Sequence, residues 1–236
     1  MNYKDYSYLF IVTYGRSGST LMQSLLNSLD SVQIRGENYN ALFHLHQTIR
    51  DVSKTKKLSR KRRISNPDEP WYGAGALQPL LYRNTLLNAF VSHVLRPEEG
   101  KTVLGFKEIR HSPKIMTDFQ FTAYMDFLLE TFPGAKIVFN TRNAEDVAKS
   151  GWFAQQDPEK TTATIRACDA RFARYDASSD QTILMHYDDY VTDRSKIAEL
   201  FAFLGYDYDA EVVAAIFSKP LEHAKEPPGP INPSPS

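Results

Sequence analysis

A short segment near the N-terminus, Tyr8–Leu26 (YLFIVTYGRSGSTLMQSLL), most restricts the folds open to this chain. It begins with an apolar run, Leu9–Val12, whose lack of alternation is typical of a parallel strand covered on both faces. Leucines then recur at helical spacing as far as Leu29. A tight turn containing Gly15 and Gly18 joins the two parts. The segment therefore predicts a buried strand, a glycine turn and a helix in immediate succession.

The turn has the composition of an anion-binding site. Gly15 and Gly18 remove the Cβ atoms that would block a close approach of ligand to backbone. Arg16 adds a fixed positive charge with a planar set of donors. The backbone amides that can converge on an anion at the helix N-terminus are those of Ser17, Gly18, Ser19 and Thr20. The alternative is that the glycines only suit the fold and that Arg16 is solvated.

The turn is not a Walker loop. That motif has four residues between its glycines and a lysine after the second, whereas here two residues intervene and Ser19 follows Gly18. An ordinary P-loop kinase or ATPase is therefore disfavoured. A nucleotide or small-molecule kinase of related fold remains an alternative, as does a non-catalytic nucleotide-binding module.

The rest of the chain alternates between strand and helix patterns. Strands are predicted at Thr102–Phe106, Lys136–Asn140 and Thr182–His186. Helices are predicted at Leu77–Leu95, Phe119–Phe132, Ala144–Trp152, Glu159–Ala177, Ser195–Leu204 and Ala210–Phe217. We therefore expect an α/β fold with a central parallel sheet flanked by helices. A length of 236 residues predicts one domain, over residues 1–225, followed by a proline-rich tail at 226–236.

Composition narrows the functional classes. The 28 basic and 28 acidic residues give no net charge, which argues against nucleic-acid binding. The single cysteine, Cys168, excludes an intrachain disulfide and is typical of a reducing compartment. No segment resembles a signal peptide or a membrane span, so we expect a soluble, cytoplasmic protein. His44 and His46 match no common zinc pattern, and we expect no metal.

One stretch, from Asn38 to Gly75, shows no clear period and is predicted to be a long functional insertion of helix and loop. Within it, seven basic residues and no carboxylate lie between Lys54 and Arg63. This basic run has two interpretations: a solvated loop, or a docking site for an acidic acceptor or an anionic surface.

A second candidate anion site follows the strand predicted at Lys136–Asn140. Arg142 comes just past the strand, and Ser150 lies eight residues later, expected about two turns into the next helix. Ligands of parallel α/β sheets bind beyond the carboxyl ends of the strands, so Arg142 and the glycine turn should face one crevice. Taken alone, Arg142 also suits a helix cap or a surface salt bridge. Together the two sites predict a ligand with phosphate at two places.

These motifs resemble those of the sulfotransferases that use 3′-phosphoadenosine 5′-phosphosulfate (PAPS). The family's turn for the 5′-phosphosulfate is similar to Tyr14–Leu21 (YGRSGSTL), and its motif for the ribose 3′-phosphate is similar to Arg142, Asp146-Val147 and Ser150. Its Tyr-acid-aromatic segment, followed by a helix ending in Phe-Leu-Gly, is similar to Tyr187–Gly205. The resemblance covers most of the chain. It implies the P-loop-kinase-like sulfotransferase fold, PAPS as donor, PAP as product, and Tyr187 among the nucleotide contacts.

The sequence departs from the pattern of the cytosolic members, which act on phenols and steroids, in two places. In both it looks more like the bacterial and Golgi-type carbohydrate branches. Many cytosolic members have lysine at the position of Arg16; arginine does not donate a proton at ordinary pH, so its implied role is charge stabilisation. The Arg-Lys-Gly loop of those members is absent from Phe217–Ser236. The resemblance thus implies sulfuryl transfer to a hydroxyl of a carbohydrate or glycolipid.

Glu37 is the first candidate for the catalytic base. It follows a short strand after the turn's helix, and a glutamate at this place resembles the proposed base of bacterial carbohydrate sulfotransferases. A loop ion pair with Arg35 is the alternative.

The strand end at residues 105–111 (GFKEIRH) supplies a second set of candidates. Lys107 could contact the leaving oxygen, and Glu108 or His111 could act as base or acceptor contact. A salt-bridge cluster at the strand end is the alternative. The aromatic residue on which the adenine stacks is left open among Trp71, Tyr72, Trp152 and Tyr187.

Overall fold

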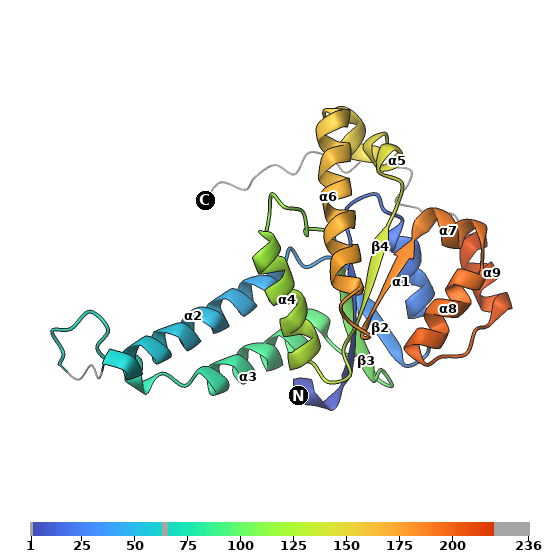
Figure 1. Cartoon of the computed structure of the whole chain (residues 1–236). Helices are drawn as coiled ribbons and strands as arrows, with labels where there is room; N and C mark the ends of the chain where they lie inside the picture. The colour runs from blue at the N-terminus through green and yellow to red at the C-terminus, as the bar shows by residue number, and fades with distance from the viewer. Residues whose placement is uncertain (1, 63–65, 220–236) are drawn as a thin grey trace, which may run out of the picture.

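Strand β1 (Ser7–Val12) lies in the middle of a parallel sheet, which explains its unbroken apolar sequence. In the computed structural model, which describes residues 2–62 and 66–219, five strands form one sheet in the order β2-β3-β1-β4-β5 (Figure 1). Tyr8 and Phe10 pack in one hydrophobic core, and Leu9 and Ile11 pack in a second core on the opposite face. The predicted α/β fold with a central parallel sheet is confirmed.

The elements with predicted ranges fall close to them, except for the helix predicted at Ala144–Trp152. The remaining strands are β2 (Val32–Arg35), β3 (Val103–Glu108), β4 (Lys136–Thr141) and β5 (Thr182–His186). The α-helices are α1 (Ser19–Asn27), α2 (Ala41–Arg62), α3 (Pro79–Phe90), α4 (Asp118–Thr131), α5 (Ala144–Ala148), α6 (Pro158–Asp176), α7 (Tyr187–Thr192), α8 (Ser195–Leu204) and α9 (Ala210–Ser218). Short 3-10 helices lie at Tyr3–Asp5, Ala74–Ala76 and Gly151–Gln155, and a π-helical turn lies at Val91–Leu95. The predicted tail, 226–236, lies outside the described residues.

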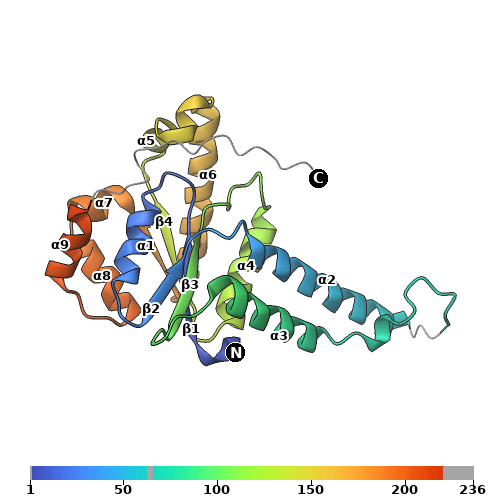
Figure 2. The same ribbon diagram turned by 180° about the vertical axis from the view of Figure 1, so that it is seen from behind.

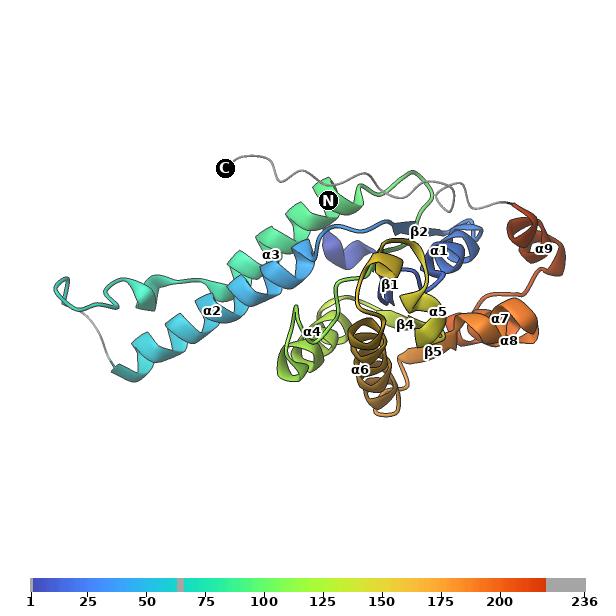
Figure 3. The ribbon, with the colours of Figure 1, turned by 90° about the horizontal axis from the view of Figure 1, so that it is seen from above.

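Helices cover both faces of the sheet. On the face of Phe10, α3, α4 and α6 contribute Phe90, Phe121 and Phe172. On the opposite face lie α1, α8 and α9 (Figure 3). All strand pairs are parallel, so the carboxyl ends of the strands meet at one edge, where the glycine turn also lies. In the described ranges, no helix is both long enough and apolar enough to cross a membrane.

The predicted helix at Ala144–Trp152 is wrong in its second half. Helix α5 ends at Ala148, and Ser150 has an extended backbone. The chain then turns at Gly151, whose φ of +56° is accessible to glycine but rarely to other residues. Ser150 therefore lies in a turn, not two turns into a helix.

Helices α2 and α3 form an arm that projects from the sheet (Figure 2). Helix α2 has 22 residues, about 33 Å at 1.5 Å per residue. Leu42 and Phe43 at its base are buried in the core. Further out, the Lys56 ammonium donates to the carbonyls of Gly75 and Leu77, both at 2.7 Å, and so ties α2 to the segment before α3. Of the described residues in 38–75, those in the main core lie near the base, as far as Ile49, and we attribute the lack of a clear period to this.

We expect His46 to make the protein acid-sensitive. His46 is buried on α2, stacks on Phe127 with ring centroids 4.4 Å apart, and burial lowers its pKa to about 4. Between pH 6.5 and 4 the unfolded chain binds this proton and the folded chain does not, so stability falls as pH falls. His46→Leu should reduce the loss of unfolding free energy between pH 7 and 5 by about 2 kcal/mol in urea denaturation. The control, exposed His44→Leu, should keep the wild-type slope; an unchanged slope in His46→Leu contradicts this assignment.

Candidate active site

The glycine turn has a strained backbone. Gly18, at φ +78°, precedes the first residue of α1, and Arg16 has φ +64°, a region that non-glycine residues seldom adopt. Such a conformation costs an arginine about 1–2 kcal/mol, and strain of this kind clusters at functional sites. Ser19 and Thr20 open α1, so their amides have no acceptor within the helix and face outward at its N-terminus. The turn is therefore built to bind an anion.

A buried polar network fixes the turn from the side of the core. The Thr13 hydroxyl donates to the Asn140 carbonyl at 2.6 Å, so the Ser17 hydroxyl is the donor in its 2.7 Å contact with Thr13 Oγ1. Asn140 Nδ2 donates to the Ser17 carbonyl at 2.8 Å, and the Tyr190 hydroxyl donates to Asn140 Oδ1 at 2.9 Å. The Ser17 side chain thus faces the core, and only the backbone of Ser17 is available to an anion.

A second anchor joins the turn to the end of β4. The Tyr14 hydroxyl accepts a hydrogen bond from the Arg142 amide at 2.9 Å and lies 2.8 Å from Asp169 Oδ1. Burial, reinforced by the nearby Asp169 carboxylate, raises the pKa of Tyr14 far above its usual value, so the phenol keeps its proton. Tyr14 therefore fixes the backbone position of Arg142.

The Arg142 guanidinium reaches the glycine turn. Its Nη1 donates to the Arg16 carbonyl at 3.2 Å, and the guanidinium carbon lies 4.8 Å from the centre of the Tyr187 ring. Among the described residues, its buried Nε has no hydrogen-bond partner, and the nearest carboxylate oxygen, on Asp188, is 3.9 Å away. A buried donor left without a partner costs about 1–3 kcal/mol. This nitrogen is therefore a candidate contact for an anionic ligand.

The 3-10 helix Gly151–Gln155 closes over Arg16. Arg16 Nε donates to the Ser150 hydroxyl at 3.1 Å. The Arg16 guanidinium also lies 5.8 Å from the centre of the Trp152 ring. Ser150 therefore contacts the Arg16 side chain, and Arg142 contacts the Arg16 carbonyl.

Two aromatic rings pack directly on the glycines of the turn. A Cβ atom on Gly15 would lie 2.4 Å from the Trp152 ring, and one on Gly18 would lie 2.0 Å from the Tyr187 ring. Any larger residue would have to displace these rings. Both glycines are thus required by packing as well as by the turn. Of the four aromatic residues left open by the sequence, the structure places Trp152 and Tyr187 at the turn.

Glu37, just past β2, is held by cations at the end of β3. Glu37 Oε1 lies 2.9 Å from Lys107 Nζ, and Oε2 lies 3.3 Å from Arg110 Nη1. Arg35 points elsewhere and pairs with Glu98 at 3.0 Å. The alternative of a Glu37–Arg35 pair is therefore wrong.

Glu108 and His111 lie below this surface, each only 1% exposed. Burial opposes the charge of Glu108, but hydrogen bonds from backbone amides such as Asn40 and from Arg110 outweigh it and lower its pKa. Burial lowers the pKa of His111 to about 4, so its ring is neutral, with Nδ1 3.1 Å from the Thr13 carbonyl. Both residues organise the loops around the site.

Two cavities meet at Glu37. The smaller, the cradle, has a volume of about 270 Å³. The predicted site residues in its wall are Gly15, Arg16, Gly18, Ser19, Thr20, Glu37, Lys107, Arg142 and Tyr187. The larger, the apolar cavity, has about 930 Å³ and includes Ile115, Phe153 and Ile165 in its wall. Glu37 and Trp152 line both.

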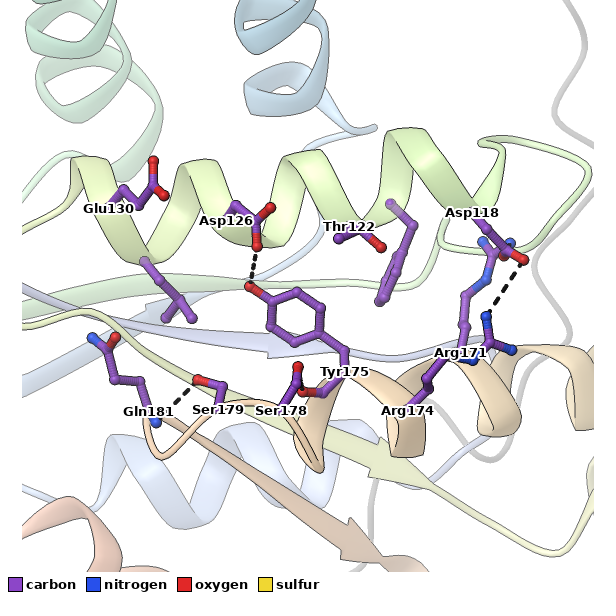
Figure 4. A pocket seen from close by; sticks show the side chains of 12 residues that line it. Asp118, Thr122, Asp126, Glu130, Arg171, Arg174, Tyr175, Ser178, Ser179 and Gln181 are labelled. Carbon is purple, nitrogen blue, oxygen red and sulfur yellow. Dashed lines mark hydrogen bonds and ion pairs between the residues drawn. The ribbon is translucent and has the colours of Figure 1, made fainter.

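A third cavity, of about 440 Å³, lies between α4 and α6 and shares no wall residue with the cradle (Figure 4). Both arginines in its wall already have a carboxylate partner. Asp118 pairs with Arg171 and Arg174, and the Tyr175 hydroxyl donates to Asp126 at 2.8 Å. These contacts join the two helices, and we assign this cavity no ligand.

Sequence reasoning missed the residues that support the site. Tyr14 stood within the motif, but its partner Arg142 is 128 positions away. The sequence pattern predicts Asn140 only as the end of a strand. The position of Asn140 could have indicated its role. It lies at a buried strand end beside the candidate Arg142, and a buried side-chain amide needs hydrogen-bond partners.

The chain belongs to the sulfotransferase family, whose sequence profile matches residues 9–210. Enzymes of this family use PAPS as the sulfuryl donor. Two similar solved structures are the sulfotransferase domains of the Synechococcus PCC 7002 olefin synthase and of the curacin biosynthetic pathway. The first is 18% identical, covers 92% of this chain and 79% of that one, and has a TM-score of 0.55. The second is 15% identical, with coverages of 88% and 76% and a TM-score of 0.51.

Both similarities show the sulfotransferase fold. Among curated proteins, none matches the chain in sequence. The match to the family profile confirms the predicted family.

We expect Tyr14→Phe to loosen Arg142 without unfolding the protein. The ring can keep its stacking on Phe172, but the Arg142 amide loses its acceptor and Asp169 its donor. The unfolding free energy should fall by about 1–3 kcal/mol, and the Kd for PAP should rise at least about threefold. Urea denaturation and calorimetric titration measure the two effects. Tyr82→Phe, on the arm, should change neither; an unaltered Kd in Tyr14→Phe means that Arg142 does not depend on this anchor.

Proposed function

We propose that this protein transfers the sulfuryl group of PAPS to a hydroxyl of an acceptor bound in the apolar cavity. The observation that carries the proposal is the wall shared by the two cavities. Glu37 lines both, so a donor in the cradle and an acceptor in the apolar cavity would meet beside one carboxylate. Alignment of this kind supplies much of the catalysis in group transfer.

The residues of the cradle suit a donor with two anionic groups. The amides of Ser19 and Thr20, with Arg16, would hold the 5′-phosphosulfate. The unpartnered Nε of Arg142 would contact the 3′-phosphate, and Ser150 would act through its hydrogen bond to Arg16. The donor supplies an activated sulfuryl group with a phosphate as leaving group.

Lys107 and Arg16 place positive charge in the cradle wall. Sulfuryl transfer builds negative charge on the oxygen of the leaving phosphate, and preorganised positive charge lowers that barrier. Arg16 is charged at any ordinary pH. Lys107 is only 7% exposed and is held by Glu37, so we assign it the contact to the leaving oxygen.

Glu37 is the base in this proposal. Its carboxylate stands at the boundary of the cavities, where an acceptor hydroxyl can reach it, and Lys107 and Arg110 orient it. Glu108 is less suited because it is buried and its oxygens accept from backbone amides. His111 is less suited because it lies below the surface.

The apolar cavity favours an acceptor with an apolar part. Ile115, Phe153 and Ile165 form an apolar part of its wall that a sugar cannot fill, whereas Ser112, Gln156 and Thr164 in the same wall can bind hydroxyls. Of the two acceptors implied by the family resemblance, a glycolipid therefore suits the cavity better than a free carbohydrate. Lys114 adds positive charge to the cavity wall and suits an anionic group on the acceptor, whereas Lys160 pairs with Asp157 at 3.1 Å.

Transfer of labelled sulfate from PAPS tests the proposal. Amphipathic alcohols should accept the label at least about tenfold faster than free sugars of matched hydroxyl number, because only they fill the apolar cavity. Tight binding of PAP with no transfer to any acceptor would instead identify a non-catalytic module. Transfer of a phosphoryl group from ATP to an acceptor would identify a kinase.

Glu37→Gln should keep PAP affinity and lower kcat by about a hundredfold or more, since a positioned base contributes 10²–10⁴. The matched variant Glu108→Gln should lower the melting temperature but cost less activity, because it breaks hydrogen bonds of the loop. Both rates are measured at saturating donor and acceptor. Full activity in Glu37→Gln together with an inactive but folded Glu108→Gln would transfer the role to Glu108.

Arg142→Ala should distinguish nucleotides by their 3′-phosphate. Loss of a charge-assisted hydrogen bond worth roughly 1.5–3 kcal/mol should weaken PAP binding about tenfold or more. Binding of adenosine 5′-phosphosulfate, which lacks that phosphate, should change little. Ser150→Ala should weaken both nucleotides to a similar and smaller extent, because Ser150 contacts the site through Arg16, which holds the 5′ group. For Arg142→Ala, equal weakening of both nucleotides in calorimetric titration would remove Arg142 from the 3′-phosphate site.

A further inference from the structure

The outer half of the arm carries exposed side chains that the transfer reaction does not use. Helix α2 leaves the core after its first turns, and the arm ends well away from the sheet (Figure 1). We define the arm tip as the described residues at 54–60 and 66–82. None of these residues lines the cradle or the apolar cavity.

The arm tip exposes large apolar residues. They come from the outer part of α2, the segment before α3 and the first turn of α3: Leu58 (40% exposed), Trp71 (38%), Tyr72 (58%), Leu80 (68%), Leu81 (59%) and Tyr82 (37%). Single exposed apolar residues are common and need no explanation. Six of them on one projecting end, together with polar residues, indicate an interaction surface.

Basic residues accompany these apolar residues. Lys54, Lys57 and Arg60 are exposed on α2, and only Lys54 has a nearby carboxylate in the described residues, Asp51 at 3.7 Å. Two acidic residues, Asp68 and Glu69, also lie in the tip. The exposed side of α2 therefore offers positive charge next to Leu58.

We propose that the arm tip docks on an anionic lipid surface. Leucine and tryptophan enter the boundary between headgroups and acyl chains, and lysine and arginine contact anionic headgroups. Pairing of two arm tips would bring like charges together, which argues against a second copy of the chain as the occupant. A nucleic acid would match the charge but not the exposed leucines. A lipid surface matches both and requires no shape complementarity from apolar residues spread over three segments.

Vesicle flotation tests the proposal without donor or acceptor, so its result is independent of the proposed function. Phosphatidylcholine vesicles with 30% phosphatidylserine should float the wild-type protein, and pure phosphatidylcholine vesicles should float much less. Lys54→Glu, Lys57→Glu and Arg60→Glu together should reduce binding to the anionic vesicles at least about tenfold. The matched control reverses Lys4, Lys196 and Lys219, which lie outside the arm, and should bind like the wild type.

A spectroscopic measurement locates the contact. Tryptophan emission should shift to the blue on addition of anionic vesicles, and Trp71→Phe should abolish the shift while largely keeping flotation. Leu80→Ser with Leu81→Ser should weaken binding without removing its dependence on phosphatidylserine. Sulfuryl transfer to a water-soluble acceptor should be the same in all arm variants.

Three results would overturn the proposal. The first is no flotation with anionic vesicles at 0.1 M salt. The second is an equal loss of binding in the arm and control variants, which would mean unspecific attraction. The third is a shift of Trp71 emission with an acidic polypeptide but not with vesicles, which would identify an acidic protein as the partner.

Discussion

The hydrogen bonds among Thr13, Ser17 and Asn140 are the contacts on which the site most depends. They join the glycine turn to the end of the neighbouring strand inside the core, where competing water is absent and each bond is correspondingly strong. A turn with Arg16 at positive φ persists only when its surroundings determine it. The network supplies that determination, and the amides that open α1 stay directed at the cradle as a result.

The first strand, the turn and α1 could be predicted from the sequence because their signals are local. An unbroken apolar run, two glycines and helical spacing each act over a few residues. The strand ends were also predictable, since parallel strands bring Arg16, Glu37, Lys107 and Arg142 to one edge. Long-range partners were not. Nothing in the sequence around Tyr14 shows that its hydroxyl will meet the Arg142 amide, and the turn at Gly151 depends on contact with Arg16.

Glu37 and Glu108, at the ends of the neighbouring strands β2 and β3, lie in different surroundings. Glu108 is enclosed by backbone amides and holds Asn40, which has a positive φ, in the loop after β2. That loop carries Glu37 to the boundary of the two cavities, where Lys107 and Arg110 meet it. The buried carboxylate thus shapes the loop, and the half-exposed one is left with a free approach from the apolar cavity.

Trp152 forms part of the wall of both cavities and packs against Gly15 as well. A single rigid ring between two ligands makes their affinities interdependent. Any molecule that moves this ring from one side changes the free energy of binding on the other, and thermodynamic linkage makes the factor identical in both directions. With donor and acceptor in the two cavities as proposed, displacement of this one indole side chain would couple the release of one ligand to the retention of the other.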